Sequence, residues 1–78
     1  MTAFDADLDT SGLKCPLPVL KARKRLIAMT PGQVLRLVAT DPASWVDVPH
    51  FCAQTGHVLL DARAEGAARI FLIRRGAG

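Results

Sequence analysis

The stretch Gly12–Pro18 constrains the local fold more than any other part of this 78-residue sequence, because it places a cysteine directly before two closely spaced prolines. Pro16 disfavours the helical conformation for the residue before it, and its own φ angle suits the first position of a helix. The rings of Pro16 and Pro18 fix two φ angles of the first turn. The stretch therefore predicts that Cys15 is the N-cap of a helix beginning at Pro16, with its thiol held in one exposed orientation.

The thiol of Cys15 is the candidate functional group of the chain. The first turn of a helix leaves backbone N–H groups unpaired and carries the positive end of the helix dipole, so we expect the pKa of this thiol to lie below its usual value of about 8.5. Lys14 would act in the same direction, and the Leu17 amide is the N–H expected to point at the sulfur, because proline has none. The residues predicted to form or support the site are Gly12, Lys14, Cys15, Pro16, Leu17 and Pro18.

Charge is unevenly distributed along the chain, although the net charge is only +3. Asp5, Asp7 and Asp9 crowd the N-terminal segment, whereas every charged residue between Thr10 and Thr40 is basic. This pattern predicts a positive field around the cysteine that attracts acidic partners. The alternative is a helix face that is merely solvated. The residues expected to guide the docking of a partner are Lys21, Lys24 and Arg25.

The periodicity of apolar residues predicts four strands and two helices. Pro42 and Pro49 place the start of the second helix near Asp47, after a separate turn capped by Asp41. Because β-α-β crossovers are right-handed, we expect an α/β (α+β) two-layer sandwich with both helices on one face of a four-stranded mixed sheet. The predicted order is strand 4–9, helix 16–29, strand 34–40, helix 47–55, strand 57–64 and strand 68–74.

Side-chain patterns within these elements predict which faces are buried. Arg23 falls within the apolar stripe of the first helix, so it either extends past the edge of the core or pairs with an acid such as one of the first strand. The tail from Gly76 onward should be loose. The predicted stripe of the first helix comprises Val19, Leu20, Ala22, Leu26, Ile27 and Met29, and the predicted face of the third strand comprises Val58, Leu60, Ala62 and Ala64.

The remaining residues with reactive or aromatic side chains have structural interpretations. Cys52 follows Phe51 on a predicted apolar helix face and most simply packs in the core; the alternatives are a second sulfur acceptor or a disulfide with Cys15 under oxidation. Trp45 is interpreted as a packing group, with an exposed docking contact as the alternative. The cysteines and the two histidines lack the close paired spacings of a metal site, so we expect no metal and no cofactor.

The chain length admits one domain, residues 1–78, with a core over about residues 5–75. No apolar run approaches the roughly 18 residues of a membrane span, and the N-terminus is acidic where a signal peptide is basic. We therefore expect a cytoplasmic protein with no membrane association. Two cysteines in that reducing compartment are not expected to form a structural disulfide.

Three segments of the chain resemble one protein family. Residues 8–19, LDTSGLKCPLPV, are similar to the signature of the TusA/SirA-like sulfur-carrier family, whose core motif is Cys-Pro-x-Pro. Residues 41–52, with DPA at the start and DVPHFC at the end, resemble the family's second-helix segment, and residues 70–75, IFLIRR, resemble its last strand. The similarity covers residues 5–75 in the family's order and spacing.

The resemblance implies a role in sulfur transfer for Cys15 alone. In such a carrier the cysteine accepts sulfane sulfur as a persulfide from a cysteine desulfurase or a rhodanese-type protein, and passes it to an acceptor sulfurtransferase of a relay. Family members serve tRNA 2-thiouridine synthesis, sulfur oxidation or molybdenum-cofactor pathways, and the sequence does not separate these. The resemblance implies sulfurtransferase-type activity without deciding whether the chain is an enzyme in its own right, and nothing in it demands more than a monomer.

The residues themselves support this mechanism, and two other classes of function stay open. An exposed thiolate of low pKa attacks a donor persulfide without a base beside it, and the two histidines lie far along the chain. A small RNA-binding or regulatory module would use the basic helix face. That face lacks the interleaved aromatic residues that stack on RNA bases, so direct nucleic-acid binding is not expected. A thiol redox protein would need a resolving cysteine where Pro18 stands.

Overall fold

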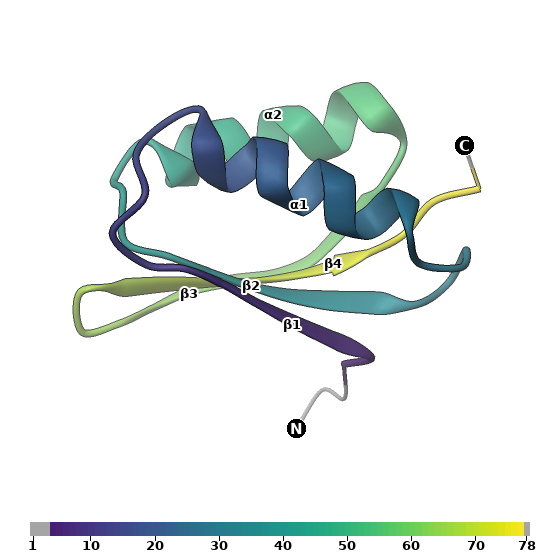
Figure 1. Ribbon diagram of the computed structural model, residues 1–78, viewed down its shortest axis with the longest axis horizontal. Helices are drawn as coiled ribbons and strands as arrows, with labels where there is room; N and C mark the ends of the chain where they lie inside the picture. Colours follow the sequence, from purple (N-terminus) through teal and green to yellow (C-terminus); the bar gives the residue numbers. More distant parts are fainter. Residues whose placement is uncertain (1–3, 78) are drawn as a thin grey trace.

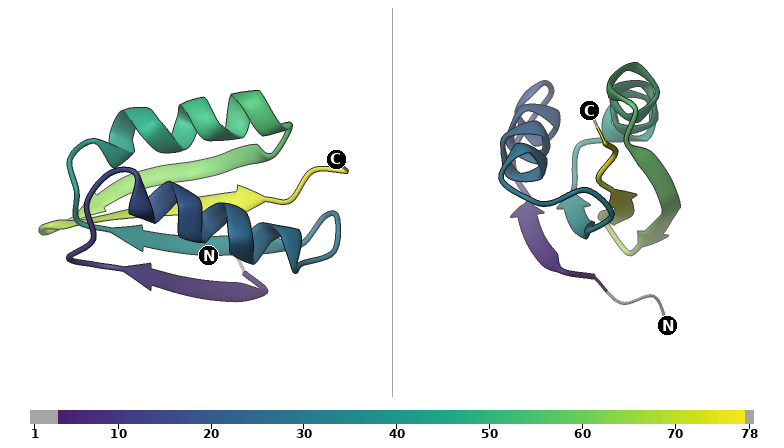
Figure 2. Two further views of the ribbon diagram at one scale, coloured as in Figure 1. Left: turned by 45° about the horizontal axis from the view of Figure 1, so that its top comes forward. Right: turned by 90° about the vertical axis from the view of Figure 1, so that its right-hand side faces the viewer.

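Strands and helices alternate along the chain in the predicted order. The computed structural model describes residues 4–77, with β1 (Ala6–Thr10), α1 (Leu17–Ile27), β2 (Val34–Ala39), α2 (Ser44–Thr55), β3 (Val58–Glu65) and β4 (Ala68–Arg74). The sheet order is β1-β2-β4-β3, in which β1 and β2 are parallel and the other neighbours antiparallel. Both helices cover the same face of the sheet (Figures 1 and 2), which confirms the predicted two-layer α+β sandwich. Neither helix of this described part is long and apolar enough to cross a bilayer.

The core lies between the two helices and the face of the sheet that they cover. β2 is a central strand, and its Leu35, Leu37 and Ala39 are completely buried, while the residues between them are only half-buried. This difference arises because side chains of a strand alternate between two faces and only one face is covered by helices. Residues of the other elements that complete the core cluster are Ala22, Leu26, Val48, Phe51, Cys52, Phe71 and Ile73.

Both helices begin at residues other than those predicted. α1 begins at Leu17, one residue later than expected, and α2 begins at Ser44, three residues earlier than expected. The main-chain oxygen of Asp41 accepts hydrogen bonds from the Ser44 N–H (3.0 Å) and the Ser44 Oγ (2.6 Å), so the turn after β2 continues directly into α2. Pro49 therefore lies inside α2, where it has no main-chain N–H to donate to the preceding turn.

Two apolar residues predicted to lie in the buried stripe of α1 are exposed. Leu20 is 50% exposed and Ile27 is 64% exposed, whereas Ala22 and Leu26 are completely buried. Leu20 lines the groove between α1 and α2, and Ile27 lines a hollow with Thr55 and His57, so both side chains lie beside the contact between the helices and are not covered by it. The buried stripe of α1 is therefore narrower than the apolar pattern indicates.

The prediction that alternate residues from Val58 share one face of β3 is also wrong. Leu59 pairs with Ile73, and the next paired residue of β3 is Asp61, opposite Leu72, so the register shifts at Leu60. Such a bulge places two residues of one strand against one position of its neighbour and reverses the alternation beyond it. Leu59, rather than Val58 or Leu60, packs against the core.

The C-terminal segment is held against the rest of the molecule as far as Gly76. The Gly76 N–H donates a hydrogen bond to Nδ1 of His57 (2.9 Å), and Arg75 Nε donates to the main-chain oxygen of Leu26 (2.7 Å). The imidazole ring of His57 lies 5.6 Å from the Phe51 ring. The expectation of a loose tail is therefore wrong for Gly76, while the last residue, Gly78, lies outside the described residues.

This contact makes the stability of the fold sensitive to acid. Burial, with a contribution from the charge of Arg75, lowers the pKa of His57 below its usual value of about 6.5. On acidification, His57 of the unfolded chain therefore binds a proton at a higher pH than His57 of the folded chain. The stabilisation is complete above about pH 6.5 and is lost as the pH falls through the lower pKa of His57 in the folded state. In the variant His57→Asn, the amide oxygen replaces Nδ1 as an acceptor that does not titrate. We expect wild type to lose stability relative to this variant on acidification, measured as the free energy of unfolding in urea; parallel pH curves would contradict this.

Candidate functional site

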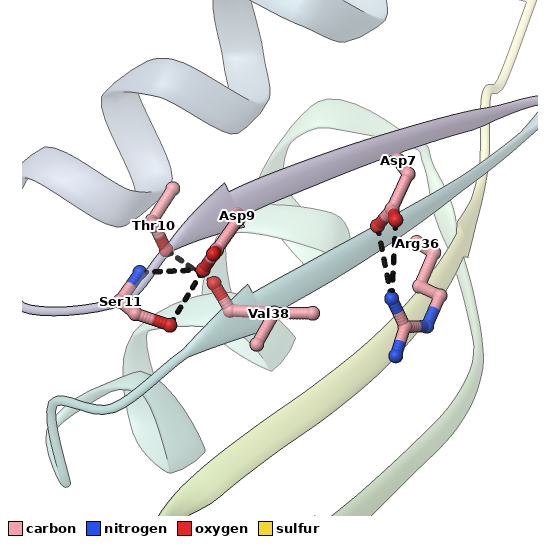
Figure 3. Close-up of polar contacts among 6 residues, drawn as sticks. All are labelled: Asp7, Asp9, Thr10, Ser11, Arg36 and Val38. Atoms are coloured by element: carbon pink, nitrogen blue, oxygen red, sulfur yellow. Dashed lines mark hydrogen bonds and ion pairs between the residues drawn. The ribbon is translucent and has the colours of Figure 1, made fainter.

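The loop that leads to Cys15 is fixed to the end of the neighbouring strand. Thr10 is completely buried, and its hydroxyl donates a hydrogen bond to the main-chain oxygen of Val38 in β2 (2.6 Å; Figure 3). The Ser11 N–H donates to Oδ1 of Asp9 (2.9 Å), and the Gly12 N–H donates to the Thr40 hydroxyl (2.8 Å). Gly12 has a φ of +82°, a conformation that favours glycine. These contacts hold the loop at the carboxyl edge of β1 and β2, where the sequence placed it.

Asp41 connects this loop to the start of α2. Its Oδ2 accepts a hydrogen bond from the Cys15 N–H (2.5 Å), and its Oδ1 accepts one from the Ala43 N–H (3.2 Å). The two carboxylate oxygens therefore join segments 26 residues apart in the sequence. Cys15 is exposed, so its main chain is anchored while its thiol remains accessible.

A groove of about 320 Å³ lies between α1 and α2, and Cys15 forms part of its wall. Its apolar lining comes mainly from Val19, Leu20 and Phe51. Polar residues that line the groove are Arg23 from α1 and Asp47, His50, Gln54 and Thr55 from α2. The arrangement places an accessible thiol beside a mostly apolar depression with charged groups of both signs.

The prediction of a lowered pKa for Cys15 is wrong. The neighbouring Asp47 carboxylate, through hydrogen bonding and through its charge, raises the pKa of Cys15, and burial and the charge of Asp41 act in the same direction. Cys15 is not the N-cap of α1; Pro16 occupies that position. The Leu17 N–H does not point at the sulfur but donates to the main-chain oxygen of Lys14 (2.8 Å). Cys15 therefore lies one residue farther from the helix than the sequence predicts, and the Leu17 N–H is not available to its sulfur.

Sequence analysis missed the acidic residues beside the thiol. The sequence pattern indicates Asp41 only as a cap and Asp47 only as the approximate start of the second helix. The expectation that no base lies beside the cysteine is wrong, because Asp47 and His50 both line its groove. The signal that could have revealed this is topological, since the loops after β1 and β2 lie at one edge of the sheet when these strands are parallel.

The basic residues proposed for docking form a separate surface. Lys21, Lys24 and Arg25 are exposed and line a second hollow with Leu8 of β1 and Ala28. This hollow shares none of the residues that line the groove beside the cysteine. These three basic residues therefore lie apart from the groove of the thiol, in which Arg23 is the basic residue of the lining.

The position of Arg23 answers a question that the sequence left open. Arg23 lines the groove between the helices and is exposed, so it extends past the core. The acid of β1 that forms an ion pair is Asp7, and its partner is Arg36 of β2 (3.1 Å; Figure 3).

Cys52 and Trp45 have the structural roles expected of them. Cys52 is 3% exposed within the core cluster, and burial raises its pKa to about 11, which confirms the packing interpretation. The Trp45 ring lies edge-on to Phe71 with 5.6 Å between centroids, and Arg69 lies 5.8 Å above it. Trp45 is nevertheless 37% exposed.

Within residues 4–77, no three metal-ligating side chains of His, Cys, Asp or Glu come together.

Comparison with known proteins assigns the chain to a family. Residues 6–75 match the family model described as sulfurtransferase TusA. The chain belongs to the TusA family. A sulfur carrier protein TusA from Allochromatium vinosum is 51% identical over 75 residues, covering 96% of this chain and 99% of that protein. One from Pseudomonas aeruginosa is 38% identical, covering 94% and 92%.

The fold of this TusA-family chain also matches a solved structure. The crystal structure of the SirA-like protein from Desulfitobacterium hafniense superposes with a TM-score of 0.81 at 20% identity, covering 92% of this chain and 99% of that one. At that identity the likeness concerns the fold. Together with the sequence matches, it confirms the TusA/SirA-like resemblance.

The acidic surroundings of Cys15 lead to a direct test of its titration. In a Cys52→Ala background, which leaves one thiol, we expect the pKa of Cys15 to lie above that of a thiol in an unstructured peptide. Asp47→Asn removes both the hydrogen-bonded carboxylate and its charge, so the pKa should fall. The measurement is the ultraviolet absorbance of the thiolate as a function of pH. A Cys15 pKa below the peptide value, or one that does not fall in the Asp47→Asn variant, would disprove this description of the site.

Proposed function

We propose that this protein is a sulfur-relay carrier in which Cys15 accepts sulfane sulfur as a persulfide and hands it to a partner protein. The observation that carries the proposal is the accessible thiol of Cys15, whose main chain is anchored by Asp41 beside a groove. A partner must bring its own sulfur to this thiol, so exposure of the sulfur and rigidity of its loop both serve the transfer. Membership of the TusA family and the names of its relatives support the same role.

The distribution of the two cysteines favours a carrier over a thiol redox protein. A dithiol redox cycle needs a resolving thiol that can reach the first one. Cys52 is buried in the core, and its raised pKa makes it a poor nucleophile. A single accessible thiol is suited to holding one sulfur atom and releasing it to the next thiol.

The partners that this function requires follow from its chemistry. The donor is a cysteine desulfurase or a rhodanese-type protein, and the acceptor is a sulfurtransferase of a relay, for example in tRNA 2-thiouridine synthesis or sulfur oxidation. The protein works as a single-domain monomer in the cytoplasm, and Gly12, Lys14 and the prolines of the motif position the persulfide. It binds no nucleic acid directly, since the acceptor protein does so in such a relay.

The proposal is tested by loading the protein with sulfur. After incubation with a cysteine desulfurase and cysteine, intact mass spectrometry should show a gain equal to one sulfur atom, reversed by a thiol reductant. Cys52→Ala, which removes only the buried thiol, should still gain it, whereas Cys15→Ser should not. Wild-type protein that stays unmodified under these conditions would overturn the proposed function.

A second test concerns the basic surface of α1. Replacing Lys21, Lys24 and Arg25 with glutamate should slow sulfur transfer with a protein partner at least tenfold at low salt, and the difference should shrink as salt is added. The matched control reverses two exposed basic residues of the other elements, Arg63→Glu and Arg74→Glu. Equal transfer rates for the α1 variant and wild type at low salt would exclude this surface from docking.

A further inference from the structure

We propose that the free edge of β1 is a docking site for an extended segment of a partner protein, which pairs with β1 as an added strand and directs acidic side chains toward α1. The inference deepens the proposed carrier function, because it rests on the need of a carrier for protein partners and names how one of them docks. Two features recognise the segment together, namely the main chain of β1 and the basic cluster of Lys21, Lys24 and Arg25.

The outer side of β1 offers main-chain groups for pairing. In the sheet order β1-β2-β4-β3, β1 is an edge strand, and within residues 4–77 no strand pairs with its other side (Figure 2). An edge strand presents a row of N–H and C=O groups that point away from its sheet. A peptide that adds to such an edge gains main-chain hydrogen bonds, and its alternate side chains contact the surface on either face.

β1 is better suited to this pairing than β3, the strand at the opposite edge. The five residues Ala6–Thr10 pair in continuous register with Leu35–Ala39. In β3 the register shifts between Leu59 and Asp61, and a bulge of this kind twists an edge away from a new strand. The regular edge of the sheet is therefore the one that lies beside α1.

A hollow of about 280 Å³ lies next to this edge, between β1 and the outer side of α1. Its apolar lining comes from Ala28 and the half-buried Leu8, and its charge comes from Lys21, Lys24 and Arg25. Every second side chain of an added strand would project toward this hollow, on the same face as Leu8. Since none of the described lining residues is acidic, a carboxylate is the side chain that fits there.

The other face of β1 carries negative charge. Leu8 packs against the core, so the neighbouring Asp7 and Asp9 lie on the face without helices, where both are exposed (Figure 3). Asp7 forms an ion pair with Arg36 (3.1 Å), and Asp9 accepts hydrogen bonds from Ser11. The remaining side chains of an added strand would lie beside these carboxylates, where further acids are repelled. The segment that fits therefore alternates acidic residues with neutral or basic ones.

The same charges disfavour a second copy of this chain at the edge. A twofold axis pairs two β1 strands antiparallel in one continuous sheet, with the helices of both copies on the same face. The basic cluster would then face its own copy, and Asp7 and Asp9 would face theirs. Like charges on neighbouring strands are destabilising, and charged side chains commonly protect sheet edges from self-association. The complementary occupant is a segment of another protein.

Single-stranded RNA is the other polyanion that would be attracted to the basic cluster. RNA has no peptide main chain that could continue the sheet. The described residues that line the hollow include no aromatic side chain on which its bases could stack. The edge of β1 and the alternation of charge therefore favour a protein segment, and RNA binding is the competing outcome of the test.

The experiment titrates synthetic peptides into isotopically labelled protein and follows the binding by NMR. One peptide alternates glutamate with threonine over about seven residues, the length of an ordinary strand. A matched peptide has the same composition but carries its glutamates grouped at one end. We expect the alternating peptide to bind about tenfold more tightly, because the grouped peptide places part of its carboxylates beside Asp7 and Asp9. Equal affinities, as expected of attraction between net charges alone, would overturn the proposal.

Methylated peptides test the pairing of the main chains. In one version of the alternating peptide the glutamate nitrogens carry methyl groups, and in another the threonine nitrogens do. Successive N–H groups of a strand point to opposite sides, so only one set faces β1, and only one version should lose binding. In the complex with the unmethylated peptide, the amides of β1 that point away from β2 should exchange with deuterium more slowly. Equal effects of the two methylations, or unchanged exchange in β1, would refute an added strand.

Protein variants and a nucleic-acid probe test the basic cluster. Arg25→Gln should weaken binding of the alternating peptide, whereas Arg63→Gln, which removes one positive charge from an exposed position of β3, should not. Equal effects of the two substitutions would contradict the proposal. A single-stranded oligonucleotide that binds more tightly than the alternating peptide and leaves amide exchange in β1 unchanged would also overturn it.

Failure of this inference is distinguishable from failure of the carrier function, because the titrations involve no sulfur. Wild type that never gains sulfur from a cysteine desulfurase refutes the carrier function, whatever the peptides do. Wild type that gains sulfur but does not bind the alternating peptide leaves the carrier function standing and excludes the edge of β1 as a docking site.

Discussion

The site depends on the hydrogen bonds that the Asp41 carboxylate accepts. It binds the Cys15 N–H with one oxygen and the Ala43 N–H with the other, while its main-chain oxygen starts α2. The parallel pairing of β1 and β2 makes this possible, because it brings the ends of both strands to one edge of the sheet. In the part of the chain that the structure describes, this bridge and the hydrogen bond from the Gly12 N–H to Thr40 both join the loop of the thiol to the segment after β2.

The surroundings of the two thiols suit a protein that carries a reactive sulfur between partners. Cys52 is kept from reaction by burial in the core. Cys15 is accessible, and Asp47, burial and the charge of Asp41 together raise its pKa, which favours the protonated thiol. Oxidation and unwanted exchange both begin with the thiolate, so a protonated thiol is protected while it remains open to a partner.

The cluster of Lys21, Lys24 and Arg25 lies apart from the acidic residues near the thiol, although the basic Arg23 lines the groove of the thiol. The acidic pair stands at the thiol, and the basic cluster of Lys21, Lys24 and Arg25 lies on the outer side of α1. A field centred away from the reacting atoms can orient an acidic partner without stabilising the thiolate itself. The charge-reversal variant of α1 and the Asp47→Asn variant therefore change different parts of the surface.

The sequence by itself determined the order of elements, the two-layer fold, the exposure of Cys15 and the burial of Cys52, because these follow from periodicity, proline geometry and composition. It did not determine the bulge at Leu60 or the contact between Gly76 and His57, which depend on pairing between distant segments. The direction predicted from the sequence for the pKa of the Cys15 thiol is also wrong, because local rules place a cysteine before Pro16 at a helix N-terminus. Only the tertiary structure decided that Asp41 and Asp47 stand beside it, because Coulomb interactions and hydrogen bonds depend on distance in space and not along the chain.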